Sequence, residues 1–365
     1  MGTTSLDPEL CNHCPDLCLH SCPASVGGGS NSASPFGKVN AIYWSSKTTK
    51  WPQDQASELS FLCTDCRMCT HSCEHDQPVA QFLYDYREET FSEKKPHRCS
   101  DAIAPNETKL GKTLHTVSRK FQAKRNSSVL FFPGCDLLGQ GAQRIEDIIN
   151  LLNNLGIQDV GIAPSTPICC GLPYRDMGDT ANFMARAIKW QRHFSKATGV
   201  IMGDPRCMKS QPMLTTTQQD KIGAPRIFSL WEVLLRSVRG PLKRKLHLKV
   251  GIHKSCHLNL QLQSAKIPRS LFDSLFAEPP ILLGEEKGLE QCCGFAGGMA
   301  QSHPKAAEGA ARALLNRASV LDCDAVLSFS PSCAAHLKAS RIEDEHPEAL
   351  DLVDVLLRAL GKGSG

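Results

Sequence analysis

The sequence predicts an α/β protein in which a small, helical, cysteine-rich region precedes two repeated βαβ-type domains. Beyond residue 125, short apolar runs alternate with amphipathic helical patterns, which is typical of βαβ units. One pattern also occurs twice: a strand-end cysteine, a Cys-Cys-Gly motif and a second strand-end cysteine, in that order. This part of the chain therefore contains an internal repeat. We therefore expect domains at residues 1–125, 126–240 and 241–365.

The composition is that of an ordinary globular protein with one exception. The chain has 365 residues, 41% hydrophobic and 21% charged, and its net charge of +4 gives no reason to expect a nucleic-acid partner. It lacks a signal-peptide pattern and a run of the ~20 apolar residues that span a membrane. We expect a cytoplasmic protein, or one held peripherally at a membrane by a partner. The exception is cysteine, whose 18 copies indicate metal ligation or redox chemistry.

The N-terminal region is expected to consist of loops and short helices rather than a large apolar core. From Cys11 to Cys73 it is rich in Cys, Ser and Gly and includes the flexible-looking stretch "SVGGGSNSASPFG". Amphipathic periodicity then predicts a helix within residues 78–89, and a charged helix within residues 104–128.

In the first repeat the expected elements follow one another in order. A strand ends at Cys135, and a helix over residues 144–156 is closed by its final glycine. A second strand is expected at residues 159–164 and a helix at about 180–194. The next strand ends at Cys207.

The second repeat has the same arrangement after a basic joint at residues 238–249. A strand ends at Cys256, a short strand is expected at 279–284, and a strong helical pattern covers 304–319. The last strand ends at Cys333. Two chain segments with one pattern predict two domains of one fold.

Eight N-terminal cysteines have the spacing of ligands to two cubane 4Fe-4S clusters. One run is C-x2-C-x2-C-x3-C, and the other has one extra residue between its second and third cysteines. Because the fourth cysteine of such a run commonly binds the other cluster, we expect a dicluster ferredoxin-like domain with crossed ligand sets. The expected sets are Cys11, Cys14, Cys18 and Cys73, and Cys63, Cys66, Cys69 and Cys22. C-x2-C pairs also suit structural zinc, so a zinc-stapled interaction protein is an alternative.

Eight further cysteines belong to the repeat. Neighbouring cysteines are poorly placed for a disulfide, since their Cα atoms lie about 3.8 Å apart, but both sulfurs can face one cluster. Strand-end cysteines converge at the carboxyl edge of a parallel sheet, and helices expected to begin just after three of them would favour thiolates. The expected metal ligands are Cys135, Cys169, Cys170, Cys207, Cys256, Cys292, Cys293 and Cys333. Cys99 is interpreted as a spare thiol and Cys323 as a core residue.

The repeated C…CCG…C pattern behind an N-terminal cysteine module resembles CCG-domain iron-sulfur subunits of the heterodisulfide reductase and glycolate oxidase type. The resemblance covers nearly the whole chain. It implies one or two further clusters at the CCG sites and an electron-transfer subunit of a flavin-dependent oxidoreductase, with a flavoprotein partner and with a quinone, a disulfide or a membrane-anchored partner. Because no glycine-rich dinucleotide fingerprint follows a strand, any flavin is expected on another chain.

Two alternatives within this resemblance stay open. The chain could itself reduce a disulfide at a CCG site. The resembled family also often ends each domain in C-x-x-C, where this sequence has Ser210 and His336. We hypothesise that His336 makes the second site the reactive one; the alternative is that it merely opens a surface helix.

Overall fold

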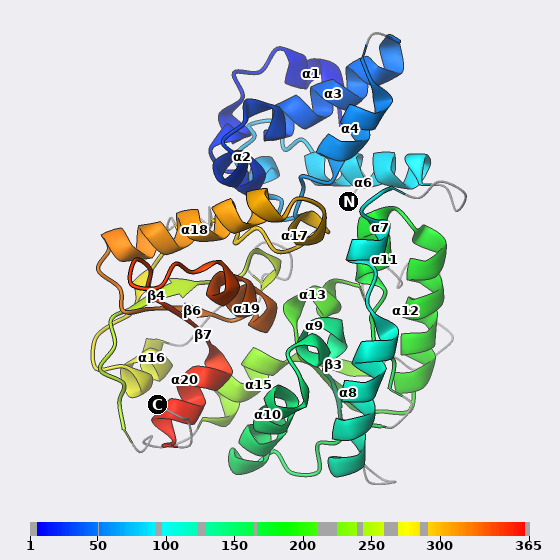
Figure 1. Cartoon of the computed structure of the whole chain (residues 1–365). Coiled ribbons are helices and arrows are strands. Elements are labelled where there is room, and N and C mark those ends of the chain that lie inside the picture. Colours follow the sequence, from blue (N-terminus) through cyan, green and yellow to red (C-terminus); the bar gives the residue numbers. More distant parts are fainter. Residues whose placement is uncertain are drawn as a thin grey trace.

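The computed structural model describes residues 6–49, 51–91, 97–122, 129–163, 166–210, 225–238, 244–258, 269–284 and 291–361. It contains two separate, entirely parallel β-sheets flanked by helices, which confirms the α/β prediction. In Figure 1 the N-terminal helices lie at the top, the second repeat lies below them on the left, and the first repeat lies on the right.

The N-terminal region is helical within its described residues. Its elements are α1 Pro8–Asn12, η1 Leu17–Leu19, α2 Pro23–Gly28, η2 Asn31–Ala33, α3 Pro35–Lys47, α4 Gln53–Ser60, α5 Met68–His71 and α6 Val79–Thr90. The stretch that looked flexible contains the end of α2 and the start of α3. Ser34 caps α3 by accepting from the Gly37 N–H at 2.9 Å, and Pro35 occupies the first helical position, where its missing N–H costs nothing.

Two further helices connect this region to the repeats. They are α7 Ser100–Ile103 and α8 Glu107–Lys120. Leu110, Leu114 and Val117 of α8 are buried in the same apolar core as the first repeat, where α8 lies against α9 and α10. The domain boundary near residue 125 stays a proposal.

The first repeat is built around a sheet of order β1-β2-β3. Its elements are β1 Val129–Phe132, α9 Gly134–Gly139, α10 Ala142–Asn154, α11 Leu172–Met177, α12 Thr180–Phe194, β2 Gly199–Met202, α13 Pro205–Lys209, β3 Arg226–Ser229 and α15 Leu230–Ser237. The strand expected at residues 159–164 is wrong. Gly161 and Ile162 make isolated bridges to two different partners, Leu130 and Gln122, so no ladder extends along them.

The second repeat is built around a sheet of order β5-β4-β6-β7. Its elements are β4 Val250–His253, α16 Arg269–Leu275, β5 Ile281–Leu282, α17 Met299–Ser302, α18 Pro304–Val320, β6 Ala325–Ser328, α19 Pro331–Ser340, β7 Glu348–Asp351 and α20 Leu352–Ala359. The joint expected at residues 238–249 lies partly outside the described residues.

The two repeats share one apolar core. Trp231 and Leu234 of α15 belong to the same buried cluster as Leu352 and Val353 of α20. These helices follow β3 and β7, which occupy equivalent places in the two sheets. The sequence analysis did not single out either strand, because each of these four-residue segments contains a charged residue and so lacks a continuous apolar run.

The N-terminal region is fixed to the second repeat by a close helix crossing. Helices α2 and α18 approach so closely that a Cβ at Gly27 would lie 2.1 Å from the backbone oxygen of Ala306, and one at Gly309 would lie 2.1 Å from that of Gly27. Only glycine fits at such a distance. The residue before α2 is Cys22, so this crossing positions one of the predicted ligands.

Candidate metal centres

Four cysteines of the N-terminal region line one pocket, which we call the N-terminal thiol pocket. One comes from the residue before α2, and three come from the stretch that ends in α5. The pocket thiols are Cys22, Cys63, Cys66 and Cys69. The last cysteine of the first run therefore lies with three cysteines of the second run, as a crossed ligand set requires. This geometry supports the predicted set, and the ligand assignment stays a proposal.

The surroundings of Cys11 support part of the other predicted ligand set. Burial, together with the nearby Cys73 and Cys14, raises the pKa of the Cys11 thiol to about 11. Burial and the adjacent Asp16 carboxylate raise the pKa of Cys18 to about 12. The fourth cysteine of the second run thus lies beside the first run.

Lys38 is a buried cation that the sequence analysis missed. Its side chain is only 2% exposed, and its Nζ donates to Cys22 Sγ at 3.3 Å. Burial by itself lowers the pKa of Lys38, but the nearby Cys22, Cys63 and Cys69 together raise it above its usual value. A buried ammonium needs a negative partner, so Lys38 stabilises negative charge on the sulfurs of this pocket. The only signal in the sequence was a lysine among the apolar residues of α3.

In the first repeat the four cysteines form a continuous chain of sulfur contacts. Its order is Cys135, Cys169, Cys170 and Cys207. The first of these follows β1 and the last follows β2, and these strands are neighbours in the sheet, so the predicted convergence is observed. The pKa of Cys170 is well below its ordinary value, because Cys169 and Cys207 donate hydrogen bonds to its sulfur. The site therefore favours a thiolate at its centre.

The second repeat has the same arrangement. The order of contacts is Cys256, Cys292, Cys293 and Cys333, and Cys256 Sγ lies 3.8 Å from Cys292 Sγ. The outer two follow the neighbouring strands β4 and β6. The pKa of Cys292 lies well below its ordinary value because Cys256, Cys293 and Cys66 hydrogen bond to it. The last of these thiols comes from the N-terminal region.

The glycine of the Cys-Cys-Gly motif has the same structural role in both repeats. Gly171 and Gly294 have positive φ values of 96° and 90°, which favour glycine. A Cβ at either would lie 2.8 Å from a backbone oxygen, of α12 in the first case and of α18 in the second. The Gly171 N–H donates to Cys169 Sγ at 3.3 Å, and the Gly294 N–H donates to Cys292 Sγ at 3.5 Å. The glycine thus brings a backbone donor to the first sulfur of the pair.

Three helices begin one or two residues before strand-end cysteines. The sequence analysis placed the starts of α9, α13 and α19 just after these cysteines, and this detail was wrong. Side-chain caps set the observed starts of the last two: Asp204 accepts from the Arg206 N–H at 2.9 Å, and Ser330 accepts from the Cys333 N–H at 3.3 Å. The cysteines consequently lie within the first turn.

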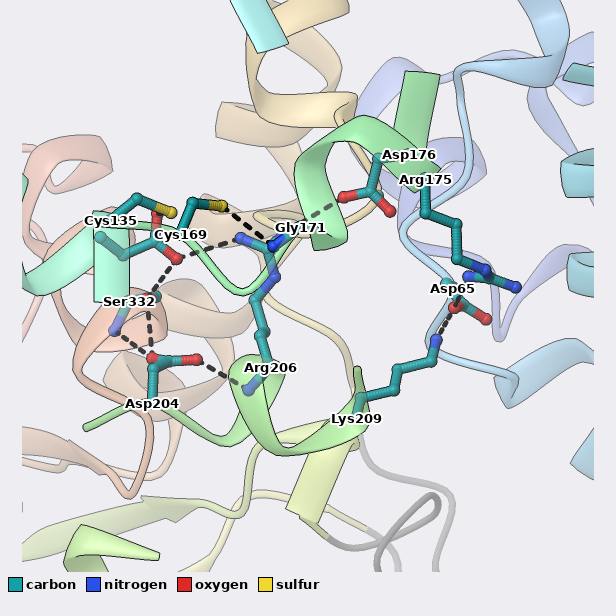
Figure 2. A network of polar contacts seen from close by, with 12 residues as sticks. Asp65, Cys135, Cys169, Gly171, Arg175, Asp176, Asp204, Arg206, Lys209 and Ser332 are labelled. Carbon is teal, nitrogen blue, oxygen red and sulfur yellow. Dashed lines mark hydrogen bonds and ion pairs between the residues drawn. The ribbon is translucent and has the colours of Figure 1, made fainter. Parts of the chain in front are cut away.

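A buried polar network connects the two repeat sites (Figure 2). Arg206 pairs with Asp136 at 3.2 Å and with Asp176 at 3.1 Å. The Ser332 hydroxyl, from the second repeat, donates to Asp204 at 2.7 Å and lies 3.1 Å from a carboxylate oxygen of Asp136. Asp136, Arg206 and Ser332 are each the sequence neighbour of a site cysteine. The network therefore fixes the two sites relative to each other.

Ser210 and His336, which stand where the resembled family often has cysteine, have different surroundings. The Ser210 hydroxyl donates to the Cys207 carbonyl at 2.8 Å and also contacts the Cys170 sulfur. His336 Nε2 lies 3.2 Å from the carbonyl of Ala307, and its ring lies 5.6 Å from that of Phe295. The idea that His336 opens a surface helix is wrong, because α19 begins at Pro331 and the ring is packed.

The two cysteines left out of the predicted sets lie in apolar surroundings. Cys99 is buried beside Phe61 and Tyr174, and Cys323 is buried beside Val326 and Leu337, as the core interpretation of Cys323 predicts. All 18 cysteines are free thiols. The sulfurs are thus available as ligands, and soft thiolates are the donors that iron-sulfur clusters and zinc prefer.

Two further observations concern the described residues alone. Among these residues, no group of three or more His, Cys, Asp or Glu side chains is arranged so that it could hold a single metal ion. Among the helices in the described ranges, none is both long and apolar enough to cross a bilayer.

Comparison with known proteins adds a family match and two curated relatives. The model of a cysteine-rich domain, CCG, matches residues 129–210 and again residues 250–338. The chain is 25% identical over 298 residues to an uncharacterized iron-sulfur protein of Methanococcus maripaludis, covering 78% of this chain and 58% of that protein. It is 22% identical over 353 residues to one subunit of the fumarate reductase (CoM/CoB) of Methanothermobacter marburgensis, covering 88% of this chain and 66% of that relative. The chain thus spans less than two thirds of either relative.

One solved structure has a similar fold. It is the crystal structure of a hypothetical protein from Helicobacter pylori. The match covers 90% of this chain and 68% of the Helicobacter pylori chain, with a TM-score of 0.55 and 13% sequence identity. At this identity the match shows the fold alone.

Proposed function

Because the chain contains two CCG cysteine-rich domains, we propose that it is an iron-sulfur electron-transfer subunit of a flavin-dependent oxidoreductase. The observation that carries the proposal is the grouping of free thiols: four line one N-terminal pocket, Cys11 lies near Cys14 and Cys73, and each repeat holds a chain of four. The names of the two relatives, an iron-sulfur protein and a reductase component, support the same class.

We propose that the two N-terminal sets hold cubane 4Fe-4S clusters and that the repeat sites hold one or two further clusters. Iron-sulfur clusters, when bound, supply one-electron donor and acceptor chemistry. The residues around the sulfurs suit such a role. The N–H groups of Gly171 and Gly294 and the Lys38 ammonium donate to sulfurs, and such donors favour the more reduced, more negative state.

Burial distinguishes a relay from a substrate-reducing site. Seven of the eight repeat cysteines are buried, and only Cys135 is partly exposed. A disulfide substrate would have to reach a sulfur directly, whereas electron transfer between sites needs no such access. The burial therefore favours the relay over disulfide reduction by this chain. We propose a flavoprotein subunit as its partner, with a quinone or a membrane-anchored protein as a further partner.

The first test is the metal content of the full chain purified without oxygen. We expect iron and acid-labile sulfide in amounts that fit three or four clusters, and an EPR signal after reduction with dithionite. Cys69→Ser, in the N-terminal thiol pocket, should lose part of the iron. The matched control Cys323→Ser, which changes a buried thiol outside all of the predicted ligand sets, should keep it. Stoichiometric zinc without iron in the parent protein would refute the proposal in favour of a zinc-stapled protein.

The second test addresses the partner. The purified chain alone should not oxidise hydroxy acids, since its sequence has no flavin or nicotinamide fingerprint. A reduced flavoprotein encoded beside it should reduce its clusters in a stopped-flow absorbance experiment. Substrate turnover by the single chain would contradict the assignment as a dependent subunit.

A further inference from the structure

The second repeat site contains a sulfur that does not belong to the repeat. Cys66, from the N-terminal cysteine run, packs with Met68, Cys256 and Cys292 in one buried cluster, in which Cys66 is 7% exposed and Cys292 is 1% exposed. The Cys66 and Cys292 thiols are hydrogen-bonded to each other. The Thr64 hydroxyl also lies 3.5 Å from Cys292 Sγ and helps to lower the pKa of this thiol. Two residues of the N-terminal run thus contact the central sulfur of the second site.

This contact is built into the backbone of both regions. Gly297, five residues after Cys292, lies so close to the N-terminal run that a Cβ there would be 2.1 Å from the Cys63 carbonyl oxygen and 2.8 Å from Thr64 Cα. Arg87 of α6 donates to the carbonyls of Cys63 and Gly297 at 3.4 and 3.0 Å. A glycine at the point of approach and a shared donor hold the two backbones together, so the position of Cys66 does not depend on its side chain alone.

The residue between Thr64 and Cys66 is held from a third direction. Asp65 has a positive φ of 54° and a buried side chain. Its carboxylate pairs with Lys209 of α13, and with Arg175 of α11 at 3.3 Å (Figure 2). Both cations belong to the first repeat. The peptide that carries Cys66 is therefore fixed by groups from all three regions of the protein.

The first site has different groups around its central sulfur. There the Ser210 hydroxyl and the Leu172 N–H approach Cys170. Both residues belong to the first repeat itself. The two sites thus share a four-thiol chain but differ in what completes it.

We infer that the second site is a composite five-thiol iron-sulfur site whose fifth sulfur, Cys66, comes from the N-terminal region, whereas the first site has four thiols. The inference rests on the proposed function, because it takes the sites as iron-sulfur centres. Cys66 also lines the N-terminal thiol pocket, so one residue belongs to both centres. The second repeat, and not the first, is then the direct neighbour of the N-terminal clusters in the relay.

The test compares single serine variants of the full chain, purified without oxygen, by iron content and by EPR of the reduced protein. Cys69→Ser identifies the signal of the N-terminal thiol pocket, because Cys69 lines that pocket. Cys293→Ser identifies the signal of the second site, and Cys170→Ser that of the first. We expect Cys66→Ser to change the first two of these signals together and to leave the third intact. A Cys66→Ser protein that matches Cys69→Ser and keeps the second-site signal would overturn the inference.

A cross-linking experiment tests the same geometry without mutation and without iron. The full-length, metal-free, reduced protein is treated with the dithiol reagent dibromobimane, and the linked peptides are mapped by mass spectrometry. We expect Cys66 to be joined to Cys292 or Cys256. Linkage of Cys66 only to Cys22, Cys63 or Cys69 contradicts the composite site. A parent protein without iron would defeat the proposed function, and this experiment would still decide where Cys66 lies.

Discussion

Arg87 offers the sharpest test of how the three regions are held together. Its side chain is 1% exposed and donates to four carbonyls from separate parts of the chain: Ser60 at 3.2 Å through Nε, Asp176 at 2.8 Å, Gly297 at 3.0 Å and, at the longest distance, Cys63 at 3.4 Å. The guanidinium also lies 4.5 Å from the ring centre of Phe61. We predict that Arg87→Met, which keeps the apolar stem and removes every donor, strongly destabilises the protein.

The magnitude follows from the acceptors that lose this donor. A buried acceptor left unsatisfied costs about 1–3 kcal/mol, so the three closest carbonyls give roughly 3–9 kcal/mol. The variant no longer has to bury a charge, and water can reach some of the carbonyls, which offsets part of this cost. We expect a net loss of about 3–5 kcal/mol, a large fraction of the ~5–15 kcal/mol by which folded proteins are stable.

The assay is urea unfolding of the full chain followed by circular dichroism, with Arg98→Met as the matched control. Arg98 is 69% exposed in its side chain and pairs with Glu58 at the surface, so its loss should destabilise the protein far less than the loss of Arg87. The loss of stability in Arg87→Lys should lie between those of the other two variants, since one ammonium cannot reach all of the carbonyls that Arg87 contacts. If Arg87→Met costs no more than Arg98→Met, the idea that Arg87 joins the three regions is refuted.

Three further predictions address the helix crossing, a surface carboxylate and the buried lysine. Gly27→Ala should cost more than about 1–3 kcal/mol in urea unfolding, because its Cβ would meet the Ala306 oxygen at 2.1 Å; a variant as stable as the parent would show that α2 and α18 can separate freely. The pKa of Glu58 is lowered, chiefly by the Arg98 hydrogen bond, so its contribution is present above its unfolded pKa and lost as pH falls through the lower folded pKa. The stability gap between parent and Glu58→Gln should therefore be below about 1 kcal/mol at neutral pH and disappear on acidification, and a gap that grows in acid would contradict this. Lys38→Met removes the ammonium that donates to Cys22 Sγ at 3.3 Å, so an EPR-monitored redox titration should give a lower potential for the N-terminal pocket signal; an unchanged potential would argue against charge stabilisation by Lys38.

The sequence by itself determined the helices whose apolar residues recur with the helical period, and it identified the cysteines that are candidate ligands. The helix predicted at about 180–194 is α12, and the one at 304–319 is α18, because both have a sustained apolar face. Cysteine spacing selected the thiols that the structure brings together in one N-terminal pocket and in a chain of sulfur contacts in each repeat. Such features are local, so the chain can encode them within a few residues. Strands β3 and β7 were missed because charged residues interrupt their short apolar stretches, Arg226 in β3 and Glu348 and Asp351 in β7.

Only the tertiary structure decided how the regions meet, because no local pattern encodes contacts between distant residues. Lys38 looks like any helical lysine in the sequence, yet folding buries it against Cys22. Cys66 reads as one member of a local run, yet Gly297 and Arg87 bring that run against Cys292, more than 200 residues away. Spacing identifies which residues can be ligands. Which of them share a site depends on close backbone approach and on buried charges that are paired only after folding.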